Sequence, residues 1–182
     1  LVGCSDRAAA FLRDFISVLP DRYGVLCPEG DVIGILNDKR SELQRMQDLG
    51  VQVPRSLLVL GESSPLAAGL RYPVIVKPRD FTGYEVLKKK NRILHSDQDW
   101  YGFLNLHQSS LDRFIAQEVI GGPDEKLWVC NATVDRAHKV VRFFSFRRLG
   151  TRPSHFGVTS LAVSECNEVL RALVQGIAEA SA

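Results

Sequence analysis

Short apolar runs separated by turn residues dominate the hydrophobic pattern of the chain, and stretches with helical periodicity lie between them. Runs of β-branched and aromatic residues predict strands, and apolar positions three and four residues apart predict amphipathic helices. The predicted strands cover residues 1–3, 25–27, 32–36, 56–60, 74–77, 85–87, 92–95, 114–120, 127–134 and 139–146. The predicted helices follow Ser5 or Asp6 and cover 39–49, 64–70, 97–106 and the segment from Ser164 onward. This order of elements predicts an α+β fold.

A single charge interrupts the apolar strand at residues 74–77. Lys77 stands between Val76 and Pro78, and the proline keeps Lys77 extended, so that its ammonium is directed beyond the end of the strand. A cleft that contains anions is one destination for this side chain. Bulk water, reached by snorkelling, is the other.

A second lysine opens the helix predicted at residues 39–49. Asn37 or Asp38 caps this helix, which places Lys39 in the first turn, where the helix dipole opposes a cation. A purely structural choice would favour an acid at this position. Lys39 is therefore either a candidate functional residue or a surface lysine.

The strand predicted at residues 114–120 runs into polar residues. A Gly-Gly-Pro sequence follows it, and two acids, Asp124 and Glu125, come next. A solvated hairpin turn has the same composition. The stretch becomes informative only together with the two lysines.

In this order and at these spacings, the three stretches resemble the ATP-grasp superfamily. The resemblance is to carbamoyl-phosphate synthase large-chain ATP-binding domains and to predicted carboxylate–amine ligases, and it covers most of the chain. It implies a partial ATP-grasp fold of two α+β subdomains with the nucleotide between them, preceded by the remnant of a Rossmann-like lobe. The implied boundaries are 1–37 for the lobe, 38–112 for the small subdomain and 113–182 for the start of the large subdomain.

The resemblance also implies how ATP is held. Lysines bind the phosphates, and a glycine-rich flap closes over the phosphates and donates backbone hydrogen bonds to them. An extended linker hydrogen-bonds to the adenine edge, and a carboxylate binds the ribose. Only one glycine stands in the expected flap, and Arg79 and Thr82 are expected to offer phosphate contacts in place of the missing backbone donors. Asp124 and Glu125 both fit the ribose position. The implied nucleotide-binding residues are Lys39, Lys77, Thr82, Gly83, Gln117, Glu118, Val119, Ile120, Asp124 and Glu125.

Arginines gather in a polar stretch at residues 147–157, which is predicted to be a loop. A guanidinium binds carboxylate or phosphate through two parallel hydrogen bonds, and an acyl-phosphate presents both groups. Arg148 and Arg152 are the candidate catalytic residues, for the γ-phosphate or the substrate carboxylate. A solvated loop is the alternative.

The resemblance implies Mg²⁺, bound by an acid on one late strand and a Glu-x-Asn sequence on the next. No such pattern follows the last predicted helix, so we expect the magnesium ligands beyond residue 182. The chain does not begin with Met. We therefore expect a fragment with little or no ligase activity by itself.

Composition excludes several classes of function. The net charge of +2 is too small to indicate a nucleic-acid partner, and no apolar run reaches membrane-spanning length. The four cysteines have no pair spacing typical of zinc or redox sites, which indicates a reducing, cytoplasmic setting. Nothing in the sequence marks an oligomeric state.

The sequence therefore predicts an ATP-dependent carboxylate–amine (or thiol) ligase acting through an acyl-phosphate, with ATP and small-molecule carboxylate and amine substrates as partners. A catalytically inactive nucleotide-binding or interaction module is the first alternative, favoured by the glycine-poor flap. A carbamoyl-phosphate-synthase-like enzyme that uses bicarbonate is the second.

Overall fold

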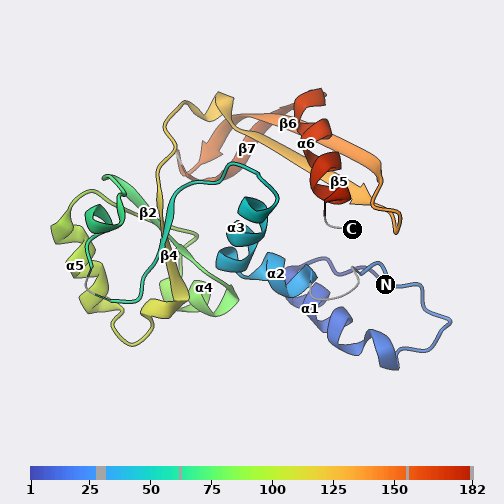
Figure 1. The fold of residues 1–182 in the computed structure, drawn as a ribbon, viewed down its shortest axis with the longest axis horizontal. Helices are drawn as coiled ribbons and strands as arrows, with labels where there is room; N and C mark the ends of the chain where they lie inside the picture. The colour runs from blue at the N-terminus through green and yellow to red at the C-terminus, as the bar shows by residue number, and fades with distance from the viewer. Residues whose placement is uncertain (28–31, 62, 155, 181–182) are drawn as a thin grey trace. The chain divides into compact units, whose positions relative to one another are not determined.

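The structure, a computed structural model, describes residues 1–27, 32–61, 63–154 and 156–180. Strands and helices alternate in it, and they form two compact units, Leu1–Val119 and Ile120–Ala182 (Figure 1). All paired strands in both units run antiparallel. The architecture is α+β, as the sequence predicted.

The first unit begins with α1 (Asp6–Phe15), η1 (Ile16–Val18) and α2 (Val32–Asn37). Ser5 caps α1 as predicted, because its hydroxyl accepts a hydrogen bond from the Ala8 N–H at 3.2 Å. The strand predicted at 32–36 is wrong. This apolar run forms α2, since a short apolar run has no periodicity that separates a strand from a buried helix.

A four-stranded sheet organises the rest of the first unit, in the order β1-β4-β2-β3. In this sheet Lys77 pairs with Ile115, and Gln117 pairs with both Ile75 and Ser56. The elements of this part are α3 (Lys39–Asp48), β1 (Ser56–Leu58), η2 (Pro65–Ala68), β2 (Val74–Pro78), α4 (Phe81–Leu87), β3 (Arg92–Leu94), α5 (Asp97–Leu106), η3 (Leu111–Arg113) and β4 (Phe114–Glu118).

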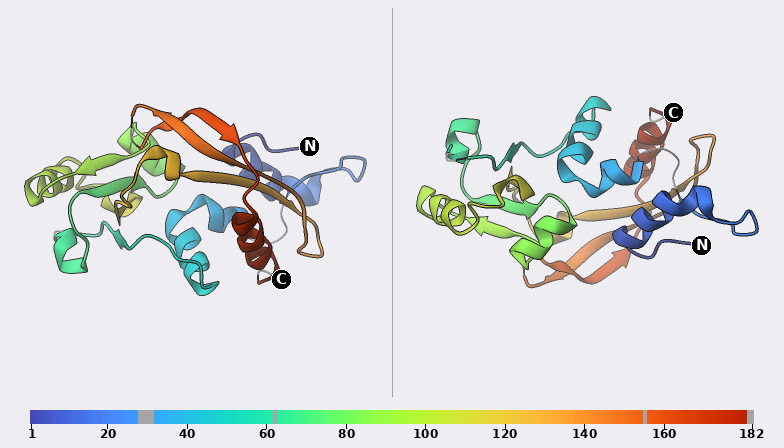
Figure 2. Two further views of the ribbon diagram at one scale, coloured as in Figure 1. Left: turned by 90° about the horizontal axis from the view of Figure 1, so that it is seen from above. Right: turned by 90° about the horizontal axis from the view of Figure 1, so that it is seen from below.

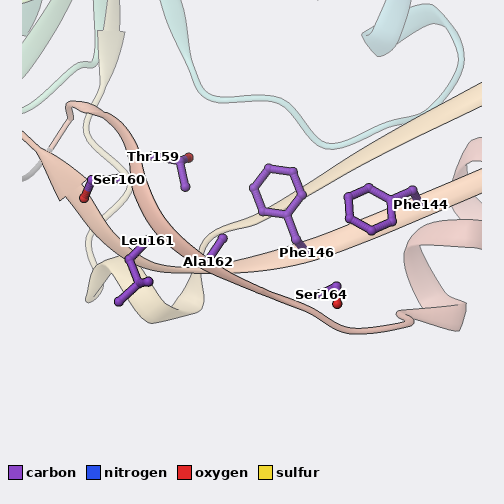
Figure 3. Close-up of a pocket in the computed structure, with 7 residues that line it drawn as sticks. All are labelled: Phe144, Phe146, Thr159, Ser160, Leu161, Ala162 and Ser164. Atoms are coloured by element: carbon purple, nitrogen blue, oxygen red, sulfur yellow. The ribbon is translucent and has the colours of Figure 1, made fainter.

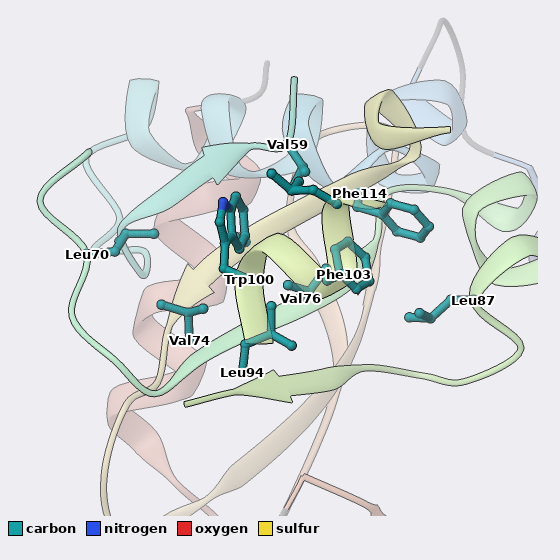
Figure 4. Packing of buried hydrophobic residues seen from close by; sticks show 11 residues of the cluster. Val59, Leu70, Val74, Val76, Leu87, Leu94, Trp100, Phe103 and Phe114 are labelled. Carbon is teal, nitrogen blue, oxygen red and sulfur yellow. The ribbon is translucent and has the colours of Figure 1, made fainter. Parts of the chain in front are cut away.

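The hydrophobic core lies on one face of this sheet. Val74 and Val76 alternate with Ile75 and Lys77, so the first pair faces the core and the second pair the opposite side. Trp100 and Phe103 of α5 pack against this face together with Phe114, as Figure 4 shows. Trp100 is fully buried, which confirms the prediction that it packs in the core rather than stacking on a base.

Helix α4 occupies the segment predicted to be a flap followed by a strand at 85–87. That prediction is wrong. Asp80 caps α4 through a 2.8 Å hydrogen bond from the Gly83 N–H to its carboxylate, and Leu87 joins the core at the other end. Gly83 is buried, and a Cβ there would lie 2.4 Å from the Arg113 carbonyl oxygen. Gly83 therefore serves close packing of α4 rather than flexibility.

The second unit contains η4 (Asp124–Lys126), β5 (Trp128–Val134), β6 (Val140–Arg152), β7 (Val158–Ser164) and α6 (Glu168–Glu179). The three strands form a sheet in the order β5-β6-β7, which is long and twisted in both views of Figure 2. Two predictions are wrong here. The expected arginine loop is strand as far as Arg152, and the last helix begins after its cap Asn167 rather than at Ser164.

Candidate functional site

A chain of polar side chains crosses the non-core face of the first sheet. The Lys77 Nζ donates a hydrogen bond to the Gln117 Oε1 at 2.7 Å, and the Gln117 Nε2 donates one to the Ser56 Oγ at 2.9 Å. Gln117 is only 4% exposed. Lys77 and Gln117 are diagonal neighbours on adjacent strands, so the strand register itself brings them together.

Lys77 has cationic neighbours instead of an ion-pair partner in the described structure. Burial lowers the pKa of the Lys77 ammonium below its usual value, and the charges of Lys39 and Lys90 lower the pKa further, whereas Glu42 raises it. The cluster Lys39, Lys77 and Lys90 is called the lysine cluster below. Like charges near a half-buried ammonium repel one another, and a negative charge would lower this repulsion.

The first turn of α3 is anchored to the end of β2, which positions Lys39. The Arg79 guanidinium binds the Asp38 carboxylate with both Nε, at 3.1 Å, and Nη2, at 2.5 Å. The Lys39 N–H donates to the Arg79 carbonyl oxygen at 2.9 Å. Asp38 also caps α3 by accepting from the Arg40 N–H. Arg79 was expected to supplement the flap, but it instead fixes the first turn of α3 to the end of β2.

A groove of about 170 Å³ lies between α3 and the sheet, beside Ser56. Its walls come from Leu43 and Gln47 of α3 and from Leu58 and Ile115 of the sheet, with Arg40 and Gln44 at its edge. Pockets for small ligands usually measure about 300–1,000 Å³. This groove is therefore too small to be a complete nucleotide site.

The two predicted flap residues lie on α4. Thr82 is exposed. The Gly83 N–H, expected to face phosphates, donates instead to Asp80. A phosphate role for Thr82 and Gly83 stays a prediction, and it would require α4 to rearrange.

The predicted adenine-reading segment is the end of β4 and the residues after it. The Glu118 carboxylate accepts hydrogen bonds from the Arg55 N–H at 2.8 Å and from the Arg55 Nε at 3.2 Å. The Arg55 backbone N–H lowers the pKa of Glu118, and burial opposes this shift. Val119 ends the first unit, and Ile120, 66% exposed, begins the second. The Glu118 side chain is thus oriented towards Arg55. The linker begins directly after β4.

The two candidate ribose carboxylates lie in η4 of the second unit. Asp124 is half-buried and accepts a 2.5 Å hydrogen bond from the Thr151 hydroxyl, whereas Glu125 is exposed. The Thr151 contact ties Asp124 to β6. Both carboxylates remain candidates for the ribose.

The arginines of β6 have different surroundings. Arg147 pairs with Glu165 at 3.2 Å. Arg148 is half-buried, and within the described structure its buried Nε has no hydrogen-bond acceptor. Arg152 is exposed at the end of the strand. A bulge between Arg148 and Gly150 interrupts the pairing of β6 with β7.

The described residues contain no group of three or more His, Cys, Asp or Glu side chains that could hold a metal ion. Nor does any helix among these residues combine the length and apolar character needed to cross a membrane.

Comparison with known proteins identifies the fold. No protein-family model matches the chain, and no curated protein does. Among solved structures, N5-carboxyaminoimidazole ribonucleotide synthetase from Thermus thermophilus matches with a TM-score of 0.60 and 17% identity, over 98% of this chain and 44% of the other. The D-alanine–D-alanine ligase of Bacillus anthracis, complexed with ATP, matches with a TM-score of 0.58 and 13% identity, over 96% and 54%.

The fold is a partial ATP-grasp fold. A third match is the Aspergillus clavatus synthase in complex with ADP and 5-aminoimidazole ribonucleotide, with a TM-score of 0.61 and 11% identity, over 97% of this chain and 43% of the other. The chain thus spans about half the length of the ATP-grasp ligases it resembles. At these identities the likeness establishes the fold alone.

Two members of the candidate site escaped prediction from the sequence. Lys90 appears there only as part of a basic run, Lys88–Lys90, and Ser56 only as the start of a strand. The antiparallel pairing of β2 with β3 is what brings the end of the basic run next to Lys77. No spacing along the chain could have indicated that neighbour.

Proposed function

We propose that the chain binds the phosphates of ATP through the lysine cluster and belongs to an ATP-dependent ligase that joins a carboxylate to an amine or a thiol. The observation that carries the proposal is the half-buried Lys77 ammonium, which donates to Gln117 and whose pKa is lowered by the charges of Lys39 and Lys90. Such a cluster is unfavourable when it is empty. A triphosphate offers several negative oxygens and relieves the repulsion between the lysines.

The chemistry proposed for the ligase is a two-step transfer. A carboxylate oxygen attacks the γ-phosphorus, an O–P bond forms, the bond to the β,γ-bridging oxygen breaks, and ADP leaves. An amine then attacks the acyl carbon of the acyl-phosphate, inorganic phosphate leaves, and the amine loses a proton. Lysines that neutralise and align the phosphates lower the barrier of the first step.

The remaining predicted contacts extend the proposal. The backbone of residues 118–120, next to Gln117, is proposed to bind the adenine edge, and Asp124 or Glu125 the ribose. Arg148 and Arg152 are proposed to bind the γ-phosphate or the substrate carboxylate. Ligases with this fold have been crystallised with ATP or ADP, which supports a nucleotide as the ligand of this chain.

Calorimetric titration tests the proposal. ATP and ADP should bind saturably, and ATP should bind more tightly than GTP, because the backbone of a linker presents a donor and an acceptor that match only the adenine edge. Equal binding of ATP and GTP would contradict the adenine assignment. The absence of saturable binding by the folded chain would contradict the lysine-cluster site.

Helix α4 favours a second candidate, a nucleotide-binding module without ligase activity. The Gly83 N–H donates its hydrogen bond to the Asp80 carboxylate. The segment that forms α4 therefore lacks the row of backbone donors that a phosphate flap supplies. ADP release separates the two candidates. Release that depends on both an added carboxylate and an added amine supports the ligase, whereas ATP binding without such release supports the module.

A further inference from the structure

The second sheet carries two aromatic rings on one face. Strand alternation places Phe144, Phe146 and Arg148 on the same side of β6, and Figure 3 shows the two rings next to each other along this strand. Phe144 is 52% exposed, and the two ring centroids lie 6.0 Å apart.

The opposite side of β6 is occupied by the segment that leads into α6. Ser145 is 4% exposed there, its hydroxyl donates to the Glu165 carbonyl oxygen at 2.6 Å, and the same hydroxyl accepts from the Asn167 N–H at 3.1 Å. Phe144 and Phe146 therefore lie on the side of β6 opposite this segment. A rigid aromatic surface of this kind provides large apolar contact area for a ligand.

A groove of about 480 Å³ runs along the exposed rings, within the usual size range of small-molecule sites. Its lining is apolar or hydroxylic and contains no charged side chain: Phe144, Phe146, Thr159, Ser160, Leu161, Ala162 and Ser164. Such a lining suits an uncharged, apolar body. It disfavours a second charge within the groove, because that charge would lose water without gaining a partner.

Arg148 supplies a positive group next to this groove. It follows Phe146 on the same side of β6, and it lies opposite Ala162, which lines the groove. Its Nε is buried, and no acceptor for it exists in the described part of the chain. A buried charged donor without a partner costs free energy, and an anionic ligand would remove this cost.

We propose that the groove of the second unit binds the substrate acid, and that this acid is a monocarboxylate with an aromatic or branched apolar body. The carboxylate binds Arg148, and the body lies on Phe144 and Phe146. The inference rests on the proposed ligase function and narrows its substrate. It assigns Arg148 to the carboxylate rather than to the γ-phosphate. Dicarboxylates and phosphorylated substrates are excluded from this groove by its uncharged lining.

The test measures binding of 3-phenylpropanoate to the whole chain by ligand-observed NMR and calorimetry, without ATP. Saturable binding is expected, with no detectable binding of 3-phenylpropanamide or succinate. The amide keeps the apolar body but lacks the charge, whereas succinate adds a second charge, so this comparison requires no variant protein. Equal binding of the acid and the amide, or no saturable binding of the acid, would overturn the proposal.

Variants then locate the site. Arg148→Met should weaken binding of the acid about tenfold or more, the cost of a lost charged hydrogen bond. Phe144→Ser should weaken it about fivefold or more by removing apolar contact area. The matched control is Arg147→Gln, because strand alternation places Arg147 on the opposite side of β6, where its Nε pairs with Glu165 at 3.2 Å; it should leave the affinity unchanged.

Separate titrations keep this inference distinct from the nucleotide proposal. Binding of the acid without binding of ATP would contradict the lysine-cluster site and would still support the groove. Binding of ATP without binding of the acid would contradict only the proposal that the groove binds the acid. If Arg148→Met weakened ATP and left the acid unaffected, Arg148 would belong to the phosphates and the inference would be wrong.

Discussion

The ammonium of Lys77 is the most informative single group in the molecule. Its pKa is lowered first by burial and then by Lys39 and Lys90, so folding makes the ammonium easier to deprotonate. The unfolded chain therefore binds this proton more tightly than the folded chain does. The charged Lys77 costs stability below its folded pKa, and this cost disappears as the pH rises from the folded pKa towards the ordinary value of 10.5.

Competitive acylation measured over a pH series tests this property. Lys77 should react with the profile of an amine whose pKa lies below the ordinary lysine value of 10.5. Lys39→Gln should raise the pKa of Lys77 by removing a like charge, and bound ATP should raise it by adding opposite charge. A Lys77 profile with a pKa at or above 10.5 would contradict the partial burial and crowding of Lys77.

Lys90 and Lys89 form a matched pair for the role of the cluster. They are adjacent in sequence and both are exposed, but only Lys90 affects the pKa of Lys77. Lys90→Met should weaken ATP binding several-fold, and Lys89→Met should leave it unchanged, as measured by calorimetry. If both variants weakened ATP binding equally, Lys90 would contribute only through general surface charge and would have no specific role in the lysine cluster.

The ion pair of Asp38 with Arg79 makes a prediction about acid stability. Burial raises the pKa of Asp38, but the Arg79 guanidinium and the N–H groups of Arg40 and Ser41 outweigh burial and lower it. The contribution of Asp38 to stability is thus present above its unfolded pKa, near 3.8, and lost as the pH falls through the lower folded pKa.

Asp38→Asn should reduce the free energy of unfolding at pH 7 by about 1–3 kcal/mol, because the partly buried Arg79 loses its charged partner. The loss should shrink as the pH approaches 3. Urea unfolding at pH 7 and pH 3 measures both values. A loss that is the same at the two pH values would mean that the carboxylate charge is not what holds Arg79.

At the scale of elements, Gly83 distinguishes a packed helix from an open flap. A Cβ at Gly83 would lie 2.4 Å from the Arg113 carbonyl oxygen, whereas a Cβ at Gly102 of α5 would meet nothing within 4 Å. Gly83→Ala should destabilise the chain by about 1–3 kcal/mol, the cost of overpacking. Gly102→Ala should be neutral or stabilise by up to about 1 kcal/mol. A neutral Gly83→Ala would support the open flap.

The strands that carry the site were predictable, but the element after β2 was not. Val74–Pro78 contains a run of β-branched residues between two prolines, and Phe114–Glu118 is a short apolar run that ends in polar residues, both of which favour a strand. Helix α4 depends on the Asp80 cap and on the packing of Leu87 in a core formed by residues distant in sequence. The number of glycines in the expected flap indicates neither of these. The lysine cluster likewise needs the pairing of β2 with β3, because Lys90 is not near Lys77 in sequence.

At the scale of the whole molecule, the chain divides between Val119 and Ile120. Ile120 and the two glycines after it are exposed, and the residues on either side belong to different compact units. Thermolysin, which cleaves before large apolar residues, should cut first at Ile120 and release Leu1–Val119 and Ile120–Ala182, as read by mass spectrometry. Earlier cuts within β2 or β4 would contradict this division.

The most direct test of the account is ATP binding by Lys77→Met, measured by calorimetry beside the wild-type chain and Lys89→Met. Urea unfolding confirms that each protein is folded. We expect Lys77→Met to weaken ATP binding about tenfold or more, the value of a charged hydrogen bond, while Lys89→Met binds like the wild type. An unchanged affinity in folded Lys77→Met would contradict the central claim that this buried ammonium binds the phosphates.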